Sequence, residues 1–235
     1  AERWTDELRA APTVTLTQVD VKLENALGHH RFGATGVPPA ALASPFDVRG
    51  DLTGIGSGEW QKARGKLYVR LDYADVAAWR TWVPLPLPIE SGTGALRLWF
   101  DLANAAVTGV IADAELADVR VAIEPALPPL ELQHVVGRLQ WQQKGTRNVV
   151  SAHDMSFVTK SGEVHPLTDF DVDVDAGAGA GGAGARGTLT FARADLAPLA
   201  AVAAQLPLPA AWREELATRY PECLGDAARQ RLAQG

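Results

Sequence analysis

The 235-residue sequence has a single cysteine, Cys223. One cysteine excludes an internal disulfide and a cysteine-ligated zinc site, but it does not decide the compartment, because a periplasmic protein without disulfides has the same composition. Basic residues are in the minority, with 22 Lys and Arg against 28 Asp and Glu and a formal net charge of −6. This balance argues against a nucleic-acid-binding protein, which would need a basic face.

Long apolar runs are also missing. A membrane-spanning helix needs about 18 or more consecutive apolar residues, and no such run occurs. The sequence begins at Ala1 with neither an initiator Met nor a signal peptide, so we expect it to be an internal piece of a longer chain. Its composition, 47% hydrophobic and 21% charged, is nevertheless typical of globular proteins with a sizeable core.

Alternation with a period of two dominates the sequence and predicts about ten strands. The strand-like segments are 14–23, 46–52, 67–73, 96–102, 107–112, 119–123, 130–141, 149–157, 170–174 and 189–191. Most are separated by Gly, Pro, Asn or Asp, which is typical of antiparallel meanders. In the first segment the apolar parity changes between Leu16 and Val19, which predicts a β-bulge or a bend.

The predicted fold is therefore mainly β, with long curved antiparallel sheets, groove-like or sandwich-like, and a few short α-helices. Alternating strands have one apolar and one polar face. The apolar face must be covered by a second sheet, by helices or by a bound apolar ligand.

A repeated phrase suggests two units. Ala63-Arg64-Gly65-Lys66-Leu67 is followed by Ala74-Asp75 and a Pro-Leu-Pro at 84–86, and the same order recurs at 185–189, 194–195 and 207–209. Repetition at a long period is typical of proteins built from repeated supersecondary units, although two copies also leave chance open. We place unit boundaries at 1–83, 84–209 and 210–235, the last being helical.

Helices are expected after each Ala-Asp phrase. Asp75 is a candidate N-cap for a helix over 76–83 that Pro84 ends, and Asp195 for one over 196–206. Residues 210–220 form a further amphipathic candidate, and 225–233 a last turn or two. The Gly/Ala-rich stretch 176–187 is interpreted as the tip of a hairpin, because strand-like segments flank it.

Signs of catalysis or metal binding are weak. Asp169, Asp171, Asp173 and Asp175 alternate along one strand face, and a straight row suits solvent better than calcium, whose ligands converge. The five histidines lack metal-binding spacings, and the glycine-rich turn at 54–58 lacks the features of a phosphate loop. No cofactor is expected. The seven tryptophans leave open a ligand-binding role for some of them, with core packing as the alternative; they are Trp4, Trp60, Trp79, Trp82, Trp99, Trp141 and Trp212.

Several phrases resemble the YhdP branch of the AsmA-like envelope proteins of Gram-negative bacteria. They include Trp60 with the phrase at 63–68, Ala74-Asp75-Val76-Ala77-Ala78-Trp79, and Ser91-Gly92-Thr93-Gly94-Ala95-Leu96-Arg97-Leu98-Trp99. Leu127-Pro128-Pro129-Leu130, Gly137-Arg138-Leu139 and Thr159-Lys160-Ser161-Gly162-Glu163 are similar too, so the resemblance covers most of residues 14–210. These are strand-and-turn phrases rather than catalytic signatures.

The resemblance implies a periplasmic, non-catalytic piece of a long protein anchored in the inner membrane. Repeating β-groove units in that family are thought to carry phospholipid acyl chains towards the outer membrane. The implied partners are phospholipid and neighbouring units of the same chain, with no nucleic acid, and with membrane contact only through other parts of the parent protein. The sequence departs from the family in lacking the anchor and in its Gly/Ala tip.

If the groove exists, alternate apolar positions should form its floor. The candidates are Leu67, Val69, Leu71, Leu96, Leu98, Phe100, Val119, Val121 and Ile123. The alternative is that these side chains pack against each other and the short helices. At the level of function, a scaffold module that binds only proteins is the alternative to a lipid-binding module, and an enzyme acting on carbohydrate through the tryptophans is a third.

Overall fold

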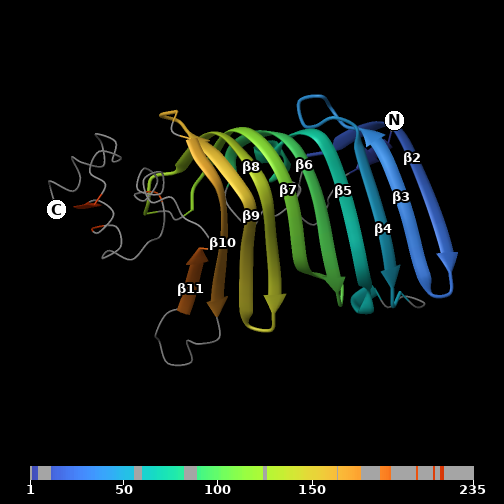
Figure 1. The fold of residues 1–235 in the computed structure, drawn as a ribbon. Coiled ribbons are helices and arrows are strands. Elements are labelled where there is room, and N and C mark those ends of the chain that lie inside the picture. Colours follow the sequence, from blue (N-terminus) through green and yellow to red (C-terminus); the bar gives the residue numbers. More distant parts are fainter. Residues whose placement is uncertain are drawn as a thin grey trace.

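The computed structural model describes residues 2–4, 12–55, 60–81, 89–123, 126–162, 164–175 and 186–191, together with residues 205, 214, 218 and 219. Most of this chain forms one antiparallel sheet (Figure 1). Its strands are β1 (Glu2–Trp4), β2 (Val14–Ala26), β3 (His29–Val37), β4 (Phe46–Thr53), β5 (Arg64–Asp75), β6 (Ile89–Ala103), β7 (Ala106–Val121), β8 (Leu130–Lys144), β9 (Arg147–Thr159), β10 (Val164–Asp175) and β11 (Arg186–Phe191). A 3₁₀ turn, η1 (Trp60–Lys62), and a short helix, α1 (Val76–Trp79), complete the described elements.

Each strand pairs only with its neighbours in sequence. The order across the sheet is β1 to β11 without a crossover, so β1 and β11 are the two edges and the sheet does not close. The predicted mainly-β antiparallel fold is confirmed. The unit boundaries at 83/84 and 209/210 stay predictions. The sheet is continuous across the first of them, because β5 and β6 on either side of it are paired.

Irregular residues bend the long strands, which curve along their length in Figure 1. Gln18, Asp118 and Asp154 have φ values of 52°, 51° and 51°, and each interrupts the strand register. An extra residue of this kind increases local twist and bends the strand. The bulge predicted from the parity change in residues 14–23 is therefore confirmed at Gln18.

Two sequence predictions about strands were wrong. The segments 107–112 and 119–123 belong to one strand, β7, because the bulge at Asp118 changes the apolar parity without ending the strand. β3 was missed altogether. Phe32 is its one large apolar side chain on the face that it shares with Val48 of β4. Gly33 and Gly36 weaken the alternation that marks a strand.

The helix after β5 is shorter than predicted. Asp75 is its N-cap as expected, and the carboxylate accepts a hydrogen bond of 3.0 Å from the Ala78 amide. The helix ends at Trp79 rather than at residue 83, because the Arg80 amide bonds to the Ala77 carbonyl in a tighter turn. The helices predicted at 196–206 and 225–233 and most of 210–220 lie outside the described residues.

The two ends of the sheet differ. Short turns at 26–29, 103–106 and 144–147 join strands at what we call the hairpin end, the lower end in Figure 1. The longer connections 38–45 and 122–129, together with α1, lie at the opposite end, which we call the α1 end. The Gly/Ala-rich tip lies outside the described residues, but β10 and β11 on either side of it are paired as a hairpin, as predicted.

Candidate functional site

One face of the sheet is built from apolar side chains that stand opposite one another across neighbouring strands. In β5 and β6 the register pairs Leu67 with Phe100, Val69 with Leu98, and Leu71 with Leu96. Residues directly opposite on paired strands share a face. Six of the nine residues predicted for the groove floor therefore form one ladder.

The same face continues across the sheet, and we call it the apolar face. Moving outwards from the central ladder, Val48 pairs with Val69 on one side, and Leu98 with Ala112 on the other. Beyond these lie the pairs Ala34↔Val48, Ala112↔Leu139, Leu139↔Ala152, Ala152↔Phe170 and Phe170↔Phe191. A continuous apolar strip thus runs from β3 to β10, and the backbone register continues to β11.

The remaining three predicted residues lie at the α1 end. Val119 and Val121 are buried there with Val76 of α1, and Ile123 packs against them. The bulge at Asp118 restores these positions to the same face as Leu116, which belongs to the same cluster. This end of the apolar face is closed by packing, as the alternative interpretation of the nine residues proposed.

No second layer covers the middle of the apolar face among the described residues. Leu67, Val69, Leu98 and Phe100 remain partly exposed, and no large described side chain is less than 2% exposed. A two-layer sandwich would bury such positions from both sides. The sheet therefore presents a half-exposed apolar surface, curved as in Figure 1.

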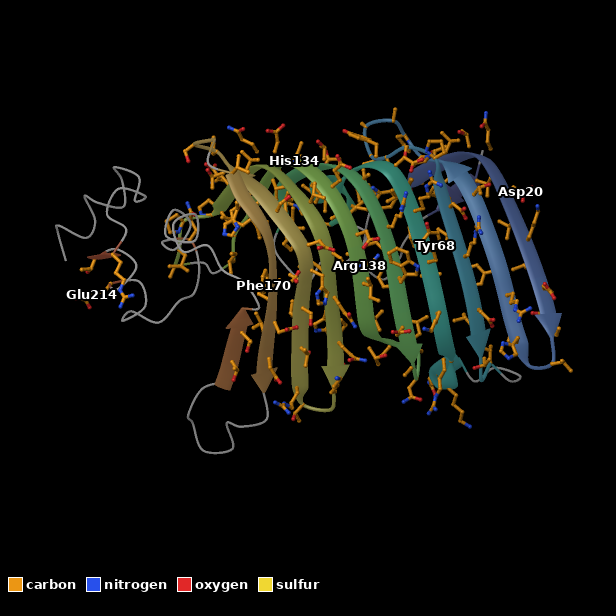
Figure 2. The ribbon with its side chains drawn as sticks, in the orientation of Figure 1. Asp20, Tyr68, His134, Arg138, Phe170 and Glu214 are labelled. Atoms are coloured by element: carbon orange, nitrogen blue, oxygen red, sulfur yellow. The ribbon has the colours of Figure 1, made fainter. Side chains whose placement is uncertain are left out.

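The opposite face is polar and paired in charge. The Arg138 guanidinium makes two hydrogen bonds to Asp113, of 2.5 and 2.8 Å, and these lower the pKa of the Asp113 carboxyl. Arg138 also lies 5.9 Å from the ring centroid of Trp99, which packs against Tyr68. Figure 2 shows Tyr68 and Arg138 over the middle strands.

A hollow of about 630 Å³ also lies on this polar side. Its lining is mixed: it includes the charged residues Arg97, Asp113, Glu115, Arg138 and Asp154, and also Leu71, Leu96, Ala114 and Val136. The Arg138 guanidinium is paired with Asp113 there.

The other sequence candidates are accounted for by local contacts. In the aspartate row, Asp173 pairs with Arg147 at 2.7 Å and Asp169 accepts a hydrogen bond from the Asp154 amide. Within the described residues no group of three His, Cys, Asp or Glu side chains could hold a metal ion.

Two of the tryptophans that sequence left open have polar partners. The Trp79 indole donates to the Leu42 carbonyl at 3.2 Å, and the Trp141 indole to Asn148 at 3.2 Å. The side chains of Trp4, Trp60, Trp82 and Trp212 lie outside the described ones. Among the histidines, His165 is buried against the Phe157 ring, which spacing alone did not indicate.

The model of the YhdP protein family matches residues 2–232, nearly the whole sequence. The chain belongs to the YhdP family. No curated protein and no solved structure gives a significant match to this YhdP-family chain. None of its described helices is long and apolar enough to cross a membrane.

Proposed function

We propose that the apolar face binds the acyl chains of phospholipids, and that this chain is a non-catalytic, periplasmic lipid-transport module of the AsmA-like type. The observation that carries the proposal is the continuous apolar ladder from β3 to β10, whose middle positions, among them Leu98 and Phe100, are partly exposed. Membership of the YhdP family and the unclosed, curved sheet support it.

The energetics favour an amphiphile as the cover. Each buried CH₂ group contributes about 0.8 kcal/mol. The gain from covering partly exposed residues such as Leu98 and Phe100 therefore grows with each methylene of a bound chain. An apolar surface of this extent left in water would instead favour aggregation.

The first test places a charge in the middle of the apolar face. Leu98→Glu should reduce co-purified phospholipid about tenfold or more, because binding would bury an unpaired carboxylate beside an acyl chain. Native mass spectrometry and lipid extraction of the purified 235-residue protein measure the loss. Circular dichroism checks that the sheet remains.

Gln140→Glu is the matched control. It adds the same charge on β8, where the register places residue 140 opposite Ile111 on the polar face. We expect normal lipid content in this variant. Equal lipid in wild type and Leu98→Glu would contradict the proposal, and a wild-type protein without any lipid would favour the scaffold module instead.

A further inference from the structure

Polar side chains do occur on the apolar face, and the exposed ones gather at the hairpin end. His30 lies opposite Leu52 and Asn25, and its Nδ1 lies 2.8 Å from the Asn25 side-chain oxygen. Five strands further, Gln143 on β8 lies opposite Asn148 on β9. We call these polar residues on β2, β3, β8 and β9 the polar border. The positions between them, on β4 to β7, are Leu52, Gly65, Leu102 and Val107.

Trp141 lies one pair inside this border. Its ring stands opposite Val110 and Val150 on the apolar face, while its indole N–H donates to Asn148 in the border. An aromatic ring that is apolar at one end and hydrogen-bonded at the other is typical of positions where hydrocarbon meets water.

The α1 end of the same face is different. Its polar groups on β9 and β10, Thr159 and His165, are only 6% and 4% exposed. They lie beside the packed cluster of Val76, Leu132 and Phe157. One end of the apolar face is thus closed and the other is open to water.

Positive charge lies just beyond the open end. The turn segments described there are 26–29, 53–55, 60–64, 103–106 and 144–147, and they contain Lys62, Arg64, Lys144 and Arg147 but no Asp or Glu. The described contacts of Arg64 and Lys144 include no carboxylate: Arg64 bonds to Asn104 at 3.5 Å. Arg64 and Lys144 lie at strand ends on the polar face. Their side chains are long enough for the charged groups to reach the hairpin end of the apolar face.

Two of the cations at the α1 end are already neutralised. Arg120 binds both Glu90 and Glu131, and Lys160 binds Glu131 at 3.1 Å. Arg80, directly after α1, is exposed, and the described contacts of its side chain include no carboxylate. At the hairpin end two side chains of this kind, Arg64 and Lys144, are available to an anionic group.

The length of the face also fits. From Leu96 to Leu102 the strand β6 rises about 20 Å, at roughly 3.4 Å per residue. The chains of one leaflet occupy about 15 Å, half of the hydrocarbon core of a bilayer. An acyl chain lying along the strands would span from the packed cluster to the polar border.

We propose that bound lipids lie along the strands with their chain ends at the α1 end and their phosphate-bearing headgroups at the hairpin end, where Arg64 and Lys144 select a phosphate over a neutral headgroup. This inference rests on the proposed function. It adds an orientation and a headgroup site to it.

Photoreactive lipids test the orientation. A phospholipid with a diazirine at the chain terminus should crosslink to residues 89–96 and 116–135, and one with the diazirine in the headgroup to 60–66 and 141–148. Peptide mapping by mass spectrometry identifies the sites. A reversed or uniform pattern would overturn the orientation while leaving lipid binding intact.

A competition experiment tests the headgroup site. The wild-type protein is offered phosphatidylglycerol and diacylglycerol with identical chains. The double variant Arg64→Gln with Lys144→Gln should lose about fivefold preference per residue, because a Lys or Arg contributes that much near anionic headgroups. Its diacylglycerol binding should not change.

Arg49→Gln with Arg70→Gln removes the same charge from the polar face, where both arginines pair with aspartates of their own strands. This control should keep the wild-type preference. If both double variants lost the preference for phosphatidylglycerol equally, the preference would arise from the net charge of the protein, and the headgroup site would be overturned. Displacement of phosphatidylglycerol by excess inorganic phosphate would show a free-phosphate site instead. If neither lipid binds the wild type, the proposed function fails as well.

Discussion

At the scale of single residues, the polar face is held by ion pairs whose geometry sequence could not specify. Arg138 follows Gly137 in a phrase recognisable from the family, but its partner Asp113 lies 25 positions away and becomes adjacent only through the register of β7 and β8. Cross-strand pairs of opposite charge contribute modestly, on the order of 0.2–1 kcal/mol.

The Asp113–Arg138 pair predicts a specific response to acid. Because the hydrogen bonds from Arg138 lower the pKa of Asp113 in the folded protein, their contribution is complete above the ordinary carboxyl range and is lost as the pH falls through the lowered pKa. Asp113→Asn should cost about 0.5 kcal/mol at pH 7 and flatten the fall in stability below about pH 4. Urea unfolding at a series of pH values measures both effects.

Asp20→Asn serves as the comparison, since Asp20 is an exposed carboxylate on β2. Its stability profile should follow the wild type throughout. A pH profile of Asp113→Asn that is parallel to the wild type would show that the pair does not contribute to acid sensitivity.

At the scale of elements, period-two alternation recovered most strands because each has one apolar and one polar face. It failed where that signal is interrupted. β3 carries two glycines and a single large apolar side chain, and the bulge in β7 moves Val119 and Val121 to the opposite parity. The same parity change in β2 had been interpreted correctly as a bulge, so the information was present in both places.

The candidate site was predictable to a similar degree. Six residues of the apolar ladder could be named because alternation fixes which side chains share a face. That Val119, Val121 and Ile123 would lie in a packed cluster depends on where α1 folds back, which no local pattern determines. The polar border at Asn25, His30, Gln143 and Asn148 was missed, since it emerges from pairing between distant segments.

Glycines on the central strands allow neighbouring backbones to approach closely. Gly94 on β6 has φ +152°, and a Cβ added there would overlap the Glu115 carbonyl oxygen of β7. Gly94→Ala should therefore destabilise the protein by about 2–3 kcal/mol, through strain and backbone displacement. The shift of the urea midpoint measures this loss.

Gly33→Ala on β3 is the matched control. A Cβ at residue 33 would meet nothing within 4 Å, and its backbone is extended. Its effect should stay within about 0.5 kcal/mol. Similar losses at both glycines would show that the cost arises from β-sheet glycines in general, and not from the close approach at Gly94.

At the scale of the whole molecule, the sheet lacks a described second layer over its middle, so its proposed ligand should act as part of the fold. A ligand that binds only the native state stabilises it by about 2.7 kcal/mol at a free concentration 100 times its Kd. The thermal midpoint should therefore rise with added phospholipid and fall on delipidation. Differential scanning fluorimetry at several lipid concentrations measures the rise.

Leu98→Glu provides the reference for this experiment. Its midpoint should not respond to lipid, because the charge prevents chains from occupying the middle of the apolar face. A wild-type midpoint independent of lipid would contradict the proposal that acyl chains cover this surface.

The order of the strands has one more consequence. Because β1 to β11 follow one another across the sheet as they do along the chain, every strand interface is formed by sequence neighbours. Stability then approximates a sum over adjacent hairpins, as in a one-dimensional array, and no distant segment has to close the structure. Such an array can lengthen or shorten by whole hairpins without changing its topology, so a longer sheet is available by duplication alone.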